Sequence, residues 1–117
     1  PSIPCLITRP DLKAVLIEAS KRKAVFLREA LSQTRTSARA TVVADRFENV
    51  DAPEVGFVTC RALERFEETV PQLVKWAPGD VVFLFFGGEG LAGSMEGLEF
   101  TQQLIPNSKK RFLYVAK

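Results

Sequence analysis

Six consecutive apolar residues at 81–86 (VVFLFF) constrain the fold of this chain more than any other feature. A strand with one face in water alternates apolar and polar side chains, whereas a strand covered on both faces is apolar throughout. The run is also far shorter than the roughly 20 residues that a membrane-spanning helix needs. It therefore predicts an interior strand of a sheet that is covered on both sides.

Short β-rich segments alternate with helical segments along the rest of the chain. The expected strands are residues 13–17, 40–44, 55–60, 81–86, 100–105 and 111–116. The turn at 106–108 is short, so the last two strands should pair as an antiparallel hairpin. Strands that alternate with helices indicate an α/β fold with a mostly parallel sheet and one antiparallel strand at its end.

Two helices follow from apolar residues spaced three and four apart. Ala24, Leu27 and Leu31 predict a helix over 21–34, with Ser20 as its N-cap. A second stripe begins at Phe66 and ends before the helix-stopping pair Pro78-Gly79. A further short helix is expected at 91–98. The glycines at 87, 88 and 90 fit neither phosphate-binding fingerprint, so a flexible loop is expected there.

The sequence excludes several kinds of chemistry. It has no histidine, which rules out a Ser-His-Asp hydrolase and any histidine-ligated metal centre. Cys5 and Cys60 are too few for a zinc cluster, and we expect two reduced thiols in the core. No signal segment or membrane span is evident, so we expect a soluble, cytoplasmic protein.

Charge is distributed unevenly along the chain. Residues 1–46 contain nine basic and four acidic residues, residues 47–107 contain three and ten, and the last ten contain four basic and none acidic. The two basic ends could form one phosphate-facing surface, as nucleic-acid-binding proteins require. An ordinary charged surface explains the same pattern.

Polar residues follow several of the expected strands, at the edge where ligands bind in parallel sheets. Glu18 follows the first strand and could accept hydrogen bonds from ribose hydroxyls, or could stabilise the N-terminus of the next helix. Residues 45–48 follow the second strand and could contact an adenine edge. Arg61 follows the third and could pair with a phosphate or carboxylate. A salt-bridged rim of Asp45, Arg46, Glu48 and Arg61 is the simpler alternative.

Several short motifs occur together in one order. They are Pro1-Ser2-Ile3-Pro4, Arg9-Pro10-Asp11-Leu12, the stretch 16–28 with its acidic strand end, two basic residues and Phe26-Leu27, Arg46-Phe47-Glu48, Cys60-Arg61-Ala62, and the basic, apolar end at 110–115. In order and spacing they resemble the C-terminal two-thirds of the GidB/RsmG family of small-subunit ribosomal RNA (guanine-7-)-methyltransferases.

The resemblance implies a fold, a cofactor and a substrate. The fold is the Rossmann-like sheet of class I methyltransferases, and the cofactor is S-adenosyl-L-methionine. Glu18 would bind the ribose, Phe47 and Glu48 the adenine, and Arg61 would lie at the cofactor pocket where it faces RNA. Ribosomal RNA would contact Arg22, Lys23, Lys110 and Arg111. The resemblance implies no protein nucleophile and no metal ligand, because the sulfonium methyl group is already activated.

The chain also departs from the family pattern. The glycine-rich cofactor turn and the helical segment that precede Pro1 in the family are not in the sequence, and the first strand of the sheet is missing with them. Phe86 precedes Gly87 where a lysine is usual, Cys60 replaces serine and Phe47 replaces alanine. We therefore expect residues 1–117 to be a partial methyltransferase domain whose sheet edges are covered by a missing N-terminal segment or in a homodimer.

Two other functions remain open at this stage. One is a degenerate, non-catalytic methyltransferase fold that binds RNA or protein through its basic ends. The other is an α/β domain of unrelated function, such as a response-regulator-like or small-molecule-binding unit, although the order of the motifs argues against it.

Overall fold

The computed structural model describes residues 2–61 and 65–117. The chain divides into two units, Pro1–Ala52 and Pro53–Lys117. Pro1 and Ala62, which belong to motifs named above, lie outside the described residues. Within those residues, no helix is long and apolar enough to cross a membrane.

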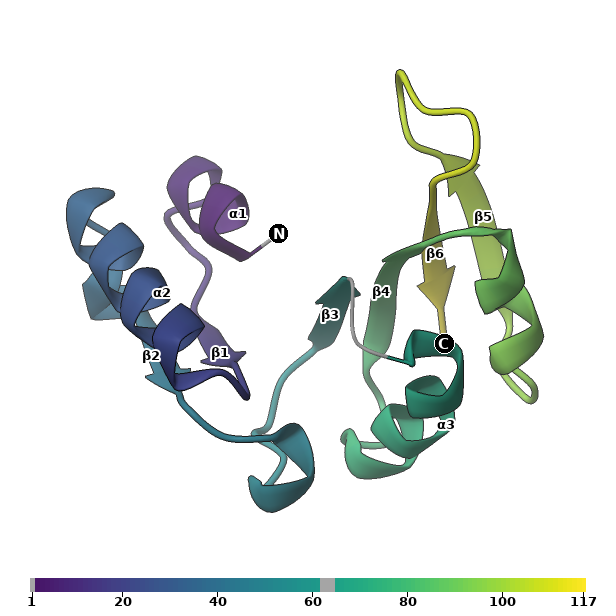
Figure 1. The fold of residues 1–117 in the computed structure, drawn as a ribbon, viewed down its shortest axis with the longest axis horizontal. Helices are drawn as coiled ribbons and strands as arrows, with labels where there is room; N and C mark the ends of the chain where they lie inside the picture. The colour runs from purple at the N-terminus through teal and green to yellow at the C-terminus, as the bar shows by residue number, and fades with distance from the viewer. Residues whose placement is uncertain (1, 62–64) are drawn as a thin grey trace. The chain divides into compact units, whose positions relative to one another are not determined.

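The first unit contains one parallel strand pair and two helices. Its elements are α1 (Ser2–Thr8), β1 (Ala14–Ile17), α2 (Lys21–Gln33), β2 (Ala40–Val43) and the 3-10 turns η1 (Ser37–Arg39) and η2 (Phe47–Asn49). β1 and β2 pair in parallel, from Ala14 opposite Ala40 to Ile17 opposite Val43. Figure 1 shows α2 lying along this strand pair. The parallel pair joined by a helix is the unit that the sequence predicted.

Leucines from three elements form the core of the first unit. Leu6 of α1, Leu16 of β1 and Leu31 of α2 are buried and lie in one cluster. Ala24 is also buried, which confirms the apolar stripe predicted for α2. Ser20 caps this helix as predicted, because its hydroxyl accepts a hydrogen bond from the backbone N–H of Lys23 at 3.3 Å.

The second unit is a four-stranded sheet with one helix and one 3-10 helix. Its elements are β3 (Phe57–Arg61), α3 (Phe66–Trp76), β4 (Val82–Gly87), η3 (Glu89–Ser94), β5 (Phe100–Leu104) and β6 (Phe112–Ala116). The strand order is β3-β4-β6-β5, with β3 parallel to β4 and β6 antiparallel to both β4 and β5. The predicted hairpin is therefore confirmed, but its reversed strand β6 lies between β4 and β5 and not at the end of the sheet, as predicted.

The apolar run is an interior strand, but its two faces differ. Phe83 and Phe85 are 4% and 0% exposed, whereas Val82, Leu84 and Phe86 alternate with them and are half-buried. α3 covers the first face, where Phe66 packs edge-on against Phe85 with ring centroids 5.8 Å apart. The prediction of equal cover on both faces was therefore wrong for the described residues. The half-buried face continues to Phe57, which is 61% exposed.

Other expectations need correction. The motif at residues 1–4 is not an isolated turn in its described part, because Ser2–Thr8 form the helix α1, and Pro4 lies in its first turn, where its missing N–H costs nothing. Cys5 is exposed on α1, so it is not a core thiol, and Cys60 is only half-buried.

The glycine segment after β4 is ordered and not a flexible loop. Residues 89–94 form η3, and the expected helix at 91–98 is this shorter 3-10 element. A Cβ atom on Gly87 would lie 2.8 Å from Cδ2 of Leu91, and one on Gly90 would overlap the carboxylate of Glu67. Both glycines therefore allow η3 to pack closely against its neighbours.

Candidate functional site

The carboxyl ends of β1 and β2 meet at one edge of the first unit. The two strands are in register to their last residues, Ile17 and Val43. The backbone N–H of Glu18 then donates to the carbonyl oxygen of Val43 at 3.0 Å, which extends the pairing by one step. Glu18 and the segment after β2 therefore leave the sheet together, at the edge where α/β sheets bind ligands.

Glu18 is half-buried and its carboxylate points back to the start of α2. Its Oε1 accepts a hydrogen bond from the backbone N–H of Ser20 at 3.3 Å. This contact supports the alternative role, stabilisation of the chain at the helix N-terminus. This contact does not prevent Glu18 from binding a ribose as well, because a carboxylate has about four acceptor sites and the N–H of Ser20 occupies one of them.

The segment after β2 is a tight turn held by its own polar side chains. Asp45 accepts hydrogen bonds from the backbone N–H of Arg46 at 2.7 Å and from Nδ2 of Asn49 at 3.0 Å. These two contacts lower the pKa of Asp45 below its usual range, with the Asn49 contact the larger cause. η2 then carries Phe47 and Glu48. Asp45 is thus the residue that organises this turn, through hydrogen bonds and not through an ion pair.

Glu48 has a partner of its own. The Nε of Arg46 lies 2.9 Å from Oε2 of Glu48, which is the ion pair expected for a salt-bridged rim. Phe47 is half-buried. The adenine contact assigned to Phe47 and Glu48 stays a prediction, and the ion pair orients the Glu48 carboxylate.

A second candidate site lies in the second unit, at the carboxyl ends of β3 and β4. Arg61 is the last residue of β3 and pairs in register with Phe86, one residue before the end of β4. A cavity of about 410 Å³ opens here and has six lining residues: Arg61, Phe86, Gly87, Ile105, Ser108 and Arg111. We call it the two-arginine cavity.

The loop between β5 and β6 closes one side of the two-arginine cavity. The backbone N–H of Ile105 donates to the carbonyl oxygen of Arg111 at 2.8 Å, and the hydroxyl of Ser108 donates to the carbonyl oxygens of Ile105 at 2.9 Å and Arg111 at 3.1 Å. These contacts fix the backbone that carries Arg111. Lys110 precedes it and is exposed. Ile105 and Ser108 were not predicted as site residues, since neither has a chemical signature that marks it in the sequence.

The predicted site residues therefore fall into two groups. Glu18, Phe47 and Glu48 belong to the first unit, together with Arg22 and Lys23 in the first turn of α2, and Arg61, Lys110 and Arg111 belong to the second.

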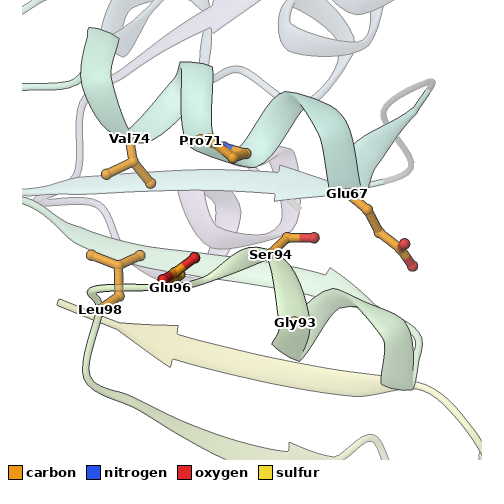
Figure 2. Close-up of a pocket in the computed structure, with 7 residues that line it drawn as sticks. All are labelled: Glu67, Pro71, Val74, Gly93, Ser94, Glu96 and Leu98. Carbon is orange, nitrogen blue, oxygen red and sulfur yellow. The ribbon is translucent and has the colours of Figure 1, made fainter.

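A separate hollow of about 490 Å³ lies between α3 and the η3 region. Figure 2 shows two of its carboxylates, Glu67 and Glu96, at opposite ends of the hollow. They do not converge, and no group of three or more potential metal-binding side chains occurs in the part of the chain that the structure describes. This hollow therefore gathers no chemistry comparable to the two strand-end sites.

Comparison with known protein families shows to which family this chain belongs. The family model GidB, rRNA small subunit methyltransferase G, matches residues 1–114. The chain belongs to the GidB family. A ribosomal RNA small subunit methyltransferase G from Acidiphilium cryptum is 33% identical over 115 residues, which cover 92% of this chain and 50% of that protein. The protein of that name from Xanthomonas campestris is 43% identical over 65 residues, 55% of this chain and 30% of that one.

Solved structures show the same fold at low sequence identity. An O-methyltransferase family 2 protein from Planctomyces limnophilus matches with a TM-score of 0.79 and 13% identity, over 99% of this chain and 45% of that one. A precorrin-6y C5,15-methyltransferase from Geobacter metallireducens matches with a TM-score of 0.74 and 14% identity, over 99% and 72%. The GidB chain thus has the class I methyltransferase fold, and it spans about half the length of the Acidiphilium relative.

Proposed function

We propose that this GidB chain is part of an enzyme that transfers a methyl group from S-adenosyl-L-methionine to a guanine base of small-subunit ribosomal RNA. The observation that carries the proposal is the position of Glu18 and residues 45–48 at the shared carboxyl edge of β1 and β2. This edge offers carboxylates for a ribose beside a turn for an adenine. The proposed substrate is the one that the name of the relatives gives. We propose that the enzyme acts in the cytoplasm.

The residues of the first unit fit the cofactor. Glu18 would bind the ribose hydroxyls through its free lone pairs. Phe47 and Glu48 would hold the adenine, with the turn kept in shape by the contacts of Asp45. The cofactor supplies a methyl group on a sulfonium, which the lone pair of the guanine ring nitrogen N7 can accept as the carbon–sulfur bond breaks. The task left to this chain is alignment and a favourable local field, which require no nucleophilic side chain.

Basic residues of both units would contact the RNA. Arg61, Lys110 and Arg111 lie in or beside the two-arginine cavity. Arg22 and Lys23 are exposed in the first turn of α2, which has no acidic residue. Cations at a helix N-terminus oppose the helix dipole, so they do not serve helix stability, and their combined positive field favours an anionic partner.

We also infer that the 117 residues are part of a larger methyltransferase domain. Away from the two-arginine cavity, the half-buried face of the second sheet carries Val82 and Leu84 together with the exposed Phe57 and Val115. Apolar area of this kind is normally covered in α/β folds, where helices lie on both faces of the sheet. An additional segment of the same chain is the proposed cover, and a homodimer is the other arrangement that would supply one.

A non-catalytic role is the second candidate, and one residue favours it. Phe86 stands where the family usually has lysine, so this chain brings no cation to that position of the two-arginine cavity. A module that binds RNA without methylating it would retain Arg61 and Arg111 but would not need a lysine at the position of Phe86.

Methyl transfer separates the two candidates. The full-length protein that contains this chain is incubated with small-subunit ribosomal RNA and S-adenosyl-L-methionine labelled in its methyl group. The enzymatic proposal expects label in a single guanine and strongly reduced incorporation in Glu18→Gln. RNA binding without any incorporation would select the non-catalytic module instead.

A further inference from the structure

The two-arginine cavity combines two kinds of recognition in a small space. Guanidinium groups bind phosphate, and aromatic rings stack on nucleobases. Arg61 and Arg111 are exposed at the cavity, whereas Phe86 is half-buried in its wall. The two cations are thus more exposed than the aromatic ring, which suits a nucleotide whose charged phosphate is hydrated and whose base is apolar on its faces.

The arginines are available to a ligand. Neither Arg61 nor Arg111 forms an ion pair with a carboxylate of the described residues, and all six lining residues are neutral or basic. Among the described residues the charges that line the cavity are two cations, which repel cationic ligands and attract anions. The required ligand is therefore anionic.

The position of Phe86 is fixed by the sheet. Its backbone pairs with Arg61 on one side and with Leu113 of β6 on the other, in the interior strand β4. The next residue, Gly87, is buried and packs against Leu91. A ring on such a rigid strand loses little entropy when a base stacks on it.

We propose that the two-arginine cavity binds one purine nucleotide of RNA, with the base stacked on Phe86 and the phosphate paired with Arg61 and Arg111. This inference rests on the proposed function, which supplies the guanine, but it makes Phe86 a residue for substrate recognition. A cavity of about 410 Å³ has room for a single nucleotide. On this account Phe86 offers a stacking contact where the lysine usual in the family would offer a charge.

The test compares guanosine 5′-monophosphate with ribose 5-phosphate, which lacks the base. Binding to the full-length protein is followed by NMR titration, without S-adenosyl-L-methionine. The dissociation constant of ribose 5-phosphate divided by that of guanosine 5′-monophosphate measures how much the base contributes to binding. For Phe86→Leu we expect this ratio to fall roughly tenfold, on the scale of aromatic–base stacking, while ribose 5-phosphate binds as before. Arg111→Gln should weaken both ligands equally.

The controls use similar residues outside the cavity. Phe57→Leu changes an exposed phenylalanine on the same face of the sheet, and Lys109→Gln changes a basic residue two positions from Arg111. Neither should alter the ratio. Phe86→Tyr keeps an aromatic ring and should retain it, which separates stacking from a folding defect.

Free nucleotides and RNA both carry a phosphate and a base. A second titration therefore uses a short single-stranded RNA with one guanosine. The RNA should bind more tightly than guanosine 5′-monophosphate, because flanking phosphates reach the other basic residues. Equal affinity would overturn the assignment to RNA. No detectable nucleotide binding, or an unchanged ratio in Phe86→Leu, would overturn the cavity assignment. Because cofactor is absent, either result is independent of methyl transfer.

Discussion

The hydroxyl of Tyr114 donates a hydrogen bond of 2.7 Å to the backbone carbonyl oxygen of Gly88, 26 residues earlier in the chain. Tyr114 is fully buried in β6, and Gly88 follows β4 beside the two-arginine cavity. Burial raises the pKa of Tyr114, so the phenol stays protonated and remains a donor at neutral pH. This bond ties the start of η3 to the reversed strand.

Tyr114→Phe should therefore destabilise the protein while preserving its core packing. We expect the free energy of unfolding to fall by about 1 kcal/mol, since the carbonyl of Gly88 loses its donor. Urea unfolding followed by circular dichroism measures this change. An unchanged unfolding midpoint would show that the bond contributes nothing net.

Arg39 is half-buried and should contribute more to the stability of the first unit than an exposed arginine does. Its guanidinium donates to three backbone carbonyl oxygens, those of Leu6 at 2.7 Å, Leu12 at 3.0 Å and Arg9 at 3.2 Å. Lysine cannot reproduce this planar set of donors, so Arg39→Lys should cost about 2 kcal/mol of unfolding free energy. Arg22→Lys, an exposed arginine on α2, serves as the control and should change the unfolding free energy little. Equal effects of the two substitutions would contradict the prediction.

The two cysteines should differ sharply in reactivity. Cys5 is exposed on α1, whereas burial raises the pKa of Cys60 to about 12. At pH 8 only about 10⁻⁴ of the Cys60 thiol is then ionised, and the thiolate is the reactive form. With a disulfide reagent, Cys5 should account for one fast equivalent, which should vanish in Cys5→Ser. Cys60→Ser should retain it, and two equally fast thiols would refute the burial of Cys60.

Asn49→Ala should raise the pKa of Asp45 towards its usual value. The side chain of Asn49 is the main cause of the lowered pKa in the native state. A lowered native pKa stabilises the fold above the unfolded value near 3.8, and this contribution is lost as pH falls through the native pKa. Carboxyl NMR titration measures the shift. The pKa of Asp11, held low by Arg9, is the internal control and should not move.

Most strands and helices could be predicted because apolar spacing reflects which side of an element is buried. The predicted helix at 21–34 ends one residue early, at Gln33, and the strand at 40–44 ends at Val43. Residues 2–8 could not be predicted as a helix, because their stability comes from packing Leu6 into a core of residues distant in sequence. The exposure of Cys5 depends on the same packing.

The candidate sites were predictable only in part. Residues directly after parallel strands could be identified from the strand pattern alone, which placed Glu18 and Arg61 at strand ends. The other side of the two-arginine cavity comes from the loop after β5, where Ile105 and Ser108 are placed by backbone hydrogen bonds and not by a motif. Such a wall depends on tertiary contacts and leaves no pattern in the sequence.

The central claim is that Glu18 binds the cofactor, and calorimetric titration of S-adenosyl-L-methionine into the full-length protein tests it most directly. Glu18→Gln removes a charged hydrogen-bond acceptor, so the dissociation constant should rise roughly 10- to 100-fold. Glu29→Gln, an exposed glutamate on α2, should leave it unchanged. Binding that is equally tight in all three proteins, or absent in the unaltered protein, would contradict the claim.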